Sequence, residues 1–204
     1  MSTKRYLSVD IEASGATPGK YSMLSLGACV VGKQDESEYQ FYREIKPISN
    51  KFNISAMRVA VQGLRCLDEV RHLPEFNHES PRFNPASILE VLKQRGETPQ
   101  KVMADYADWL NKVKGNFRLV EVGAPIKFDG MFTAWYFDNF YEGENLLGFS
   151  GDDINSLYRG AVGNLNAHVA SLGFRRHTHN ALGDAIDQAK ELESVLKIMT
   201  ESQK

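Results

Sequence analysis

The sequence predicts an α/β protein in which helices flank a mixed β-sheet. Three strand-like segments, residues 6–12, 23–31 and 38–45, come before any long helical segment, and this order is typical of an antiparallel meander. A fourth strand-like segment at 117–122 lies among the helical segments that follow. Strands that are first consecutive and then interleaved with helices favour an α/β sandwich with a mixed sheet.

The first strand is predicted from strict alternation along residues 6–12. Its apolar side chains are Leu7, Val9 and Ile11, and its polar side chains are Ser8, Asp10 and Glu12. Successive side chains of a strand point to opposite faces, so the polar set shares one face and the apolar set the other. Segments 14–20 and 46–53 contain proline with small or polar residues, which predicts loops at the ends of strands.

Helices are expected where apolar residues recur at intervals of three and four. The expected helices span 55–71, 86–94, 100–114, 129–141, 153–158, 165–172 and 180–199. Thr98 and Pro99 supply an N-cap and a first-turn proline for the third of them. Residues 72–85 carry three prolines and no periodicity, which predicts a long surface loop.

Length and composition indicate one domain over residues 1–204. The chain has 24 basic and 26 acidic residues and a net charge of −2, which excludes proteins that hold nucleic acid by bulk positive charge. Cys29 and Cys66 are too few for a disulfide framework and are expected to be buried thiols. No signal peptide or membrane-spanning run is recognisable, so a cytoplasmic protein is expected.

Asp10 and Glu12 are the first candidates for chemistry. Neighbouring carboxylates on one strand face repel each other unless a cation lies between them, and paired oxygen ligands suit Mg²⁺ or Mn²⁺. The pair also lies at the end of a strand that runs into a loop, where α/β sheets place their sites. A solvated acidic pair on a polar strand face is the alternative for so short a motif.

Two further motifs contain an acidic residue at the start of a helix. Phe128-Asp129 follows the strand-like segment 117–122, and Asp129 could equally cap the helix or interact with its dipole. His179 comes just before the closing helix and Asp184 lies in its first turn. An imidazole and a carboxylate so placed can converge on one point, although Asp184 could be only a dipole partner and His179 a surface histidine.

In combination, the stretches SVDIEASG (8–15), FDGMF (128–132) and HNALGDA (179–185) are far more specific than each is alone. With the second-strand run LSLGACVV (24–31), they resemble the DEDDh branch of the DnaQ-like 3′→5′ exonucleases. The resemblance covers the chain except about 72–98. It implies a ribonuclease H-like fold, in which helices flank a mixed five-stranded sheet whose first three strands are antiparallel.

The resemblance also assigns the catalytic residues. Asp10, Glu12, Asp129 and Asp184 would bind two Mg²⁺ or Mn²⁺ ions, with Asp10 between both, and His179 would be the general base for the attacking water. The implied enzyme is a 3′-5′ exonuclease that hydrolyses phosphodiester bonds at the 3′ end of single-stranded DNA or RNA. Its products would be 5′-mononucleotides.

Substrate contacts are expected from residues beside the motifs. The expected substrate-binding residues are Ala13, Ser14, Met23, Leu24, Phe128 and Phe132. The first two would hold the terminal 3′-hydroxyl through their backbone, and the apolar ones would stack on terminal bases, although Phe132 could belong to a core helix face. The basic candidates for phosphate contacts are Lys127, Arg175 and Arg176. The resemblance further allows a homodimer and implies no membrane partner.

The chain departs from the family pattern at three places. Ala13-Ser14 replaces the usual Thr after the first motif, Ala124-Pro125 replaces a frequent His-Asn, and the insertion around 72–98 is atypical. Neither replacement removes a metal ligand, so both bear on substrate preference. The alternative is a catalytically inactive exonuclease-like module that only binds nucleic acid or a protein, and the retention of all five motif residues argues against it. A P-loop at 15–20 is excluded because its spacing is one residue short.

Overall fold

The computed structural model describes residues 4–176 and 178–201. They contain a five-stranded sheet with the strand order β3-β2-β1-β4-β5. The strands are β1 (Lys4–Ala13), β2 (Met23–Val30), β3 (Gln40–Glu44), β4 (Arg118–Gly123) and β5 (Gly151–Asp153). β1, β2 and β3 are antiparallel neighbours, whereas β4 is parallel to both β1 and β5. The prediction of a mixed five-stranded sheet whose first three strands are antiparallel is confirmed.

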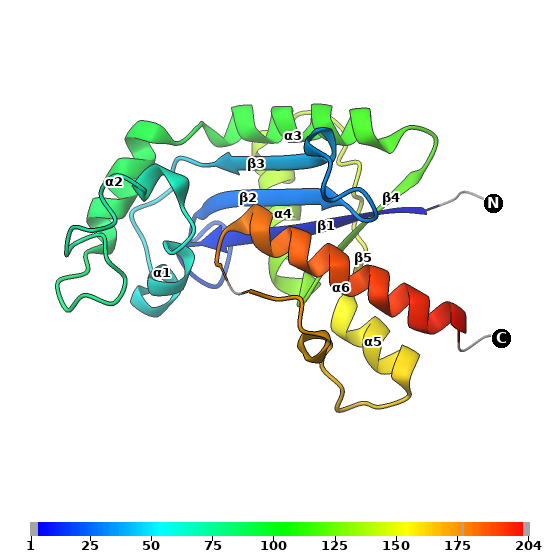
Figure 1. The fold of residues 1–204 in the computed structure, drawn as a ribbon. Coiled ribbons are helices and arrows are strands. Elements are labelled where there is room, and N and C mark those ends of the chain that lie inside the picture. The colour runs from blue at the N-terminus through cyan, green and yellow to red at the C-terminus, as the bar shows by residue number, and fades with distance from the viewer. Residues whose placement is uncertain (1–3, 177, 202–204) are drawn as a thin grey trace.

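Helices cover both faces of this sheet (Figure 1). They are α1 (Ile54–Ala60), α2 (Pro85–Arg95), α3 (Pro99–Lys114), α4 (Ile126–Phe140), α5 (Ile154–Val162) and α6 (Ala181–Glu201). The larger core joins α3 and α4 to the face of β1 that carries Leu7, Val9 and Ile11, as the alternation predicts. α5 and α6 cover the opposite face, where Val120 and Val122 of β4 pack against Leu192. None of the described helices is long and apolar enough to cross a membrane.

Two of the helix predictions are wrong. α1 ends at Ala60 instead of continuing to residue 71, and only a short 3₁₀ turn, Arg65–Leu67, follows. Glycine disfavours a helix at position 63, and the carbonyl of Gly63 accepts a hydrogen bond from Asn180 instead of from its own helix. Similarly, the stretch 165–172 contains only the 3₁₀ turn Val169–Leu172, because its periodic pattern is too short to sustain a helix.

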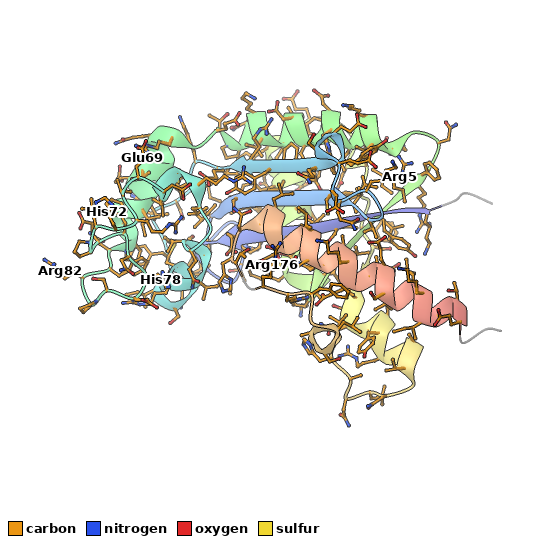
Figure 2. All side chains as sticks on the ribbon, viewed as in Figure 1. Arg5, Glu69, His72, His78, Arg82 and Arg176 are labelled. Carbon is orange, nitrogen blue, oxygen red and sulfur yellow. The ribbon has the colours of Figure 1, made fainter. Side chains whose placement is uncertain are left out.

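Residues 61–98 form a lobe at one end of the sheet, beyond α1. Glu69, His72, His78 and Arg82, which are labelled in Figure 2, lie on this lobe, and all of them except His78 are exposed. The lobe and α1 form a second core together with one residue of β2, Leu24; its other members are Met57, Ala60, Val61, Leu64, Leu67, Phe83, Ile88, Leu89 and Leu92. The lobe therefore supports the side of α1 that faces away from solvent.

Candidate active site

A cavity of about 230 Å³ opens where β1 and β4 end. All five side chains for which a catalytic role is expected line it: Asp10, Glu12, Asp129, His179 and Asp184. They come from the first strand, the fourth helix, the loop before the last helix and the first turn of that helix, so segments far apart in the sequence converge on one point.

Parallel strands explain why Asp129 meets the acidic residues of β1. The carboxyl ends of β1 and β4 lie at the same edge of the sheet, and α4 begins three residues after β4 ends. The first turn of α4 therefore lies beside the end of β1. Asp129 Oδ1 accepts a hydrogen bond from the backbone N–H of Ile11 at 3.0 Å, between Asp10 and Glu12.

A glycine on β2 explains how Asp184 reaches the same place. A Cβ on Gly27 would lie 2.2 Å from both the backbone carbon of Ala181 and the backbone nitrogen of Leu182. Only glycine allows so close a contact between β2 and the first turn of α6. Because Gly27 is the ladder partner of Asp10, this contact brings Asp184 next to the carboxylates of β1.

The carboxylates are in an environment that disfavours their charged forms. Burial raises the pKa of Asp10 well above its ordinary value, and the charges of Asp129 and Glu12 raise it further. Burial also raises the pKa of Glu12, and it raises the pKa of Asp129 to about 8. A divalent cation among these oxygens would relieve both the repulsion and the loss of hydration.

The donor set fits such a cation. Glu12, His179 and Asp184 each offer one ligand atom, and these atoms lie within 4.8 Å of one another. Carboxylate oxygens are the preferred ligands of Mg²⁺ and Mn²⁺. Asp184 is held in place by Thr178, whose hydroxyl donates to Asp184 Oδ1 at 3.0 Å. The residues present therefore suit a hard divalent ion.

Gln188 and Arg175 also belong to the site. The sequence interpretation did not include Gln188, and it left open whether Arg175 has a role there. Gln188 Nε2 donates to Asp10 Oδ1 at 2.9 Å, while its Oε1 accepts from the N–H of Ala124 at 2.8 Å. Arg175 donates to the carbonyl of Ala124 at 3.2 Å and, through Nε, to buried Glu191. The sequence did contain a signal for Gln188, because residues 184, 188 and 191 share one face of the closing helix, and that face is directed at the sheet.

Of the three basic candidates, only Arg175 lines the cavity. Its charge lowers the pKa values of Asp10 and Asp129, against the larger effect of burial. Arg176 instead pairs with Asp187 at 3.2 Å, near the start of α6 (Figure 2). Lys127 lines a different cavity, between α4 and the segment before β5.

Comparisons with known proteins agree with this geometry. No protein-family model matches the chain. A curated protein, the 3′-5′ DNA exonuclease Cap18 of Escherichia coli, is 37% identical to it over 156 residues, which span 76% of this chain and 68% of that protein. This chain belongs to the DEDDh 3′-5′ exonuclease family.

Solved structures support the fold of this exonuclease. The nuclease domain of 3′hExo, a DEDDh family member bound to rAMP, matches with a TM-score of 0.60 at 14% identity, over 95% of this chain and 92% of that one. The zinc-bound complex of E. coli Exonuclease I with single-stranded DNA has a TM-score of 0.60 at 11% identity. It covers 99% of this chain but only 41% of the Exonuclease I chain.

Four of the residues expected to contact the substrate of the exonuclease are buried. Met23, Leu24 and Phe132 are 0% exposed, so none of them has surface on which a base could stack. Ser14 is also fully buried: its hydroxyl donates to the carbonyl of Lys51, and its N–H donates to the carbonyl of Ser22. Burial counts against these four contacts: Met23 and Leu24 lie on β2, which is buried on both faces, Phe132 of α4 lies in the larger core, and the loop that contains Ser14 is closed by its own hydrogen bonds.

An apolar cavity of about 430 Å³ next to the acidic one is a better candidate for substrate contacts. Ala13 and Phe128, both expected at the substrate, line it together with Tyr21 and Ala56. Val59 of α1 is 43% exposed and lines both cavities, as does Phe128. The sequence did not predict a role for Val59 at the site, because this residue lies in an ordinary amphipathic helix pattern.

Proposed function

We propose that this exonuclease removes nucleotides from the 3′ end of single-stranded DNA with the help of two divalent cations, Mg²⁺ or Mn²⁺. The observation that supports this most strongly is the convergence of the five motif residues in one cavity. The preference for DNA is inferred from the curated relative, a DNA exonuclease, and single-strand preference from the oligonucleotide complexes of Exonuclease I.

Each polar residue has a defined part in this proposal. Asp10, Glu12, Asp129 and Asp184 hold the cations, and Gln188 keeps the carboxylate of Asp10 turned toward them. When bound, such ions provide a nucleophilic water and stabilise negative charge on the leaving oxygen. The imidazole of His179 accepts the proton of the attacking water, which converts it into the nucleophile.

The two adjacent cavities accommodate the two sides of the scissile bond. The 3′-terminal nucleoside occupies the apolar cavity, where Tyr21 and Phe128 offer aromatic surface for a base. The chain then passes Val59, which borders both cavities, so that the first phosphodiester reaches the acidic one. Hydrolysis there releases a single 5′-mononucleotide.

The experiment compares oligonucleotides that carry a label at the 3′ end with ones labelled at the 5′ end. A 3′-labelled strand should release labelled mononucleotide in the first turnover, while a 5′-labelled strand should give a descending ladder. Both should require Mg²⁺ or Mn²⁺ and stop with EDTA. Endonucleolytic fragments, or equal rates on matched RNA or duplex DNA, would contradict the proposed direction or substrate.

Matched variants test the residues. Asp129→Asn should abolish turnover, while Asp138→Asn, an exposed residue of the same helix, should keep it. His179→Ala should reduce the rate by about 10²–10⁴-fold with Mn²⁺ binding retained in a calorimetric titration. The absence of turnover on every substrate, with an intact fold and bound metal, would favour the inactive binding module.

We also propose that the enzyme works in a reducing compartment. Cys29 is buried and Cys66 half-buried, and both are free thiols. Burial raises the pKa of Cys29 to about 12, so this thiol should resist alkylation in the native protein and react only after unfolding. The homodimer remains a prediction that sedimentation equilibrium can test.

A further inference from the structure

His179 has an unusual backbone conformation. Apart from glycines, it is the one residue with a positive φ, +50°, in the described ranges 4–176 and 178–201. A side chain with a Cβ disfavours this left-handed conformation, and it persists only where the surrounding structure enforces it. Contacts from the surrounding fold therefore hold the backbone of His179 in this disfavoured conformation.

Gly63 lies directly against that backbone. A Cβ on Gly63 would come within 2.2 Å of the carbonyl oxygen of His179 and 2.4 Å of the Cα of Asn180. The side chain of Asn180 completes the contact, because its Nδ2 donates to the carbonyl of Gly63 at 2.7 Å. Its Oδ1 accepts from the N–H of Gly183 at 3.1 Å, as a helix cap does.

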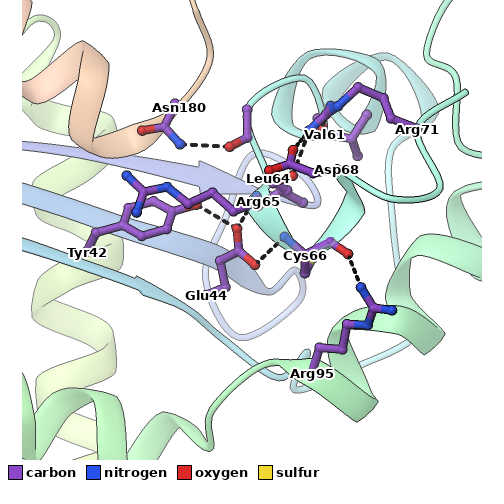
Figure 3. Close-up of polar contacts among 11 residues, drawn as sticks. Tyr42, Glu44, Val61, Leu64, Arg65, Cys66, Asp68, Arg71, Arg95 and Asn180 are labelled. Carbon is purple, nitrogen blue, oxygen red and sulfur yellow. Dashed lines mark hydrogen bonds and ion pairs between the residues drawn. The ribbon is translucent and has the colours of Figure 1, made fainter.

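Residues 61–67, here called the strut, are fixed in turn by side chains from other elements (Figure 3). The carboxylate of Glu44, at the end of β3, accepts hydrogen bonds from the N–H groups of Arg65 and Cys66. On the other side, Arg95 of α2 donates to the carbonyl of Cys66 at 2.9 Å. The sheet, through Glu44, and α2, through Arg95, thus both hold the end of the strut that is far from His179.

Arg71 holds the end of the strut that lies near His179. Its guanidinium donates to the carbonyls of Val61 at 2.8 Å and Leu64 at 2.7 Å, on either side of Gly63. Val61, Leu64 and Leu67 are at most 1% exposed, in the core that the lobe shares with α1. The carbonyls of Val61, Gly63, Leu64 and Cys66 all accept hydrogen bonds, and the apolar side chains of the strut are buried, so the strut is a well-anchored surface against which the backbone of His179 packs.

We propose that Asn180 is a positioning residue for catalysis. By connecting the loop before α6 to Gly63 of the strut, it holds His179 in the left-handed conformation that directs the imidazole into the acidic cavity. This inference rests on the proposed function, in which His179 is the general base. It gives the lobe a role, since the lobe supplies Arg71 and Arg95 that hold the strut.

The test replaces Asn180 by serine. Ser keeps an oxygen that can cap α6 but loses the amide that donates to Gly63. The matched control is Asn84→Ser, which makes the same change at the N-cap of α2. We expect Asn180→Ser to lower kcat by about 10- to 100-fold with KM and Mn²⁺ affinity unchanged, and the control to keep kcat.

A double-mutant cycle separates positioning from general damage. If Asn180 acts through His179, then His179→Ala with Asn180→Ser should be no slower than His179→Ala alone. If Asn180→Ser slows the His179→Ala enzyme by the same factor as the wild type, or leaves the wild-type kcat unchanged, the proposal is overturned.

A spectroscopic measurement keeps this result separate from that of the proposed function. In protein with ¹³C-labelled histidine, the resonance of His179, identified by its loss in His179→Ala, should shift or broaden in Asn180→Ser but not in Asn84→Ser. An unchanged resonance overturns the positioning role. Full activity of His179→Ala would instead remove His179 as the base, and the resonance would still decide whether the strut positions its ring.

Discussion

Replacing Glu121 by glutamine is expected to stabilise the protein, and the gain should depend on pH. Glu121 lies on β4 under α4, is 7% exposed, and accepts a hydrogen bond from the hydroxyl of Thr133 at 2.9 Å. Burial raises its pKa to about 7. Glutamine has almost the same shape and keeps an oxygen for Thr133, but it carries no charge.

The expected size of the gain follows from that pKa. A carboxyl whose pKa is raised in the folded state costs no stability below its unfolded value and destabilises the fold progressively as pH rises through the folded value. For a rise from 4.5 to about 7, the cost is about 3 kcal/mol at about pH 8 and under about 1 kcal/mol at about pH 5. For a chain of this length, the larger cost corresponds to a change of about 6–12 °C in Tm.

The assay is thermal and urea unfolding of metal-free protein at both pH values. Glu121→Gln should unfold several degrees above the wild type at the higher pH and nearly with it at the lower. Glu142→Gln, an exposed residue, controls for the removal of one negative charge. An equal gain at both pH values, or a loss at the higher one, would refute the assignment of a buried, unfavourable carboxylate.

Four other outcomes are expected. Gly27→Ala should cost at least about 2 kcal/mol and most of the activity, because its Cβ would push the start of α6 away. Gly160→Ala, where a Cβ meets open space, should be neutral or stabilising in the same unfolding assay. Tyr106→Phe should raise Tm slightly, since the buried hydroxyl of Tyr106 lacks a hydrogen-bond partner in the described structure. Finally, the stabilisation by Mn²⁺ over EDTA should grow from about pH 5 to about pH 8, because raised pKa values such as that of Asp129 destabilise the metal-free fold as pH rises.

The elements that the sequence predicted well are those with a local cause. Alternation along 6–12 is set by the two faces of β1, and Thr98 caps α3 through its own side chain, which accepts from the N–H of Lys101. The end of α1 has a distant cause, because Gly63 has to meet the loop before α6. β5 spans only three residues, Gly151–Asp153, which is too short for any periodicity.

The same distinction holds in the site. Asp10, Glu12 and Asp129 were expected together because of the family resemblance of their motifs, and the structure gives the physical reason, since β1 and β4 are parallel and end at the same edge of the sheet. Met23 and Leu24 lie on β2, whose eight consecutive residues are all buried, so no alternation along the sequence distinguishes a side chain facing the substrate from one facing the core. How deeply a side chain of a sheet is buried depends on tertiary packing, and the sequence of an apolar strand does not reveal it.

The start of α6 explains why the site of this exonuclease is inseparable from its fold. One helix face directs Asp184 at the acidic cavity, Gln188 at Asp10 and the loop after β4, and Glu191 at Arg175. Because these positions are fixed relative to one another by a rigid helix, any rotation of α6 moves all of them together. The close contact at Gly27 prevents that rotation, so a residue without a side chain determines the geometry of the charged ones.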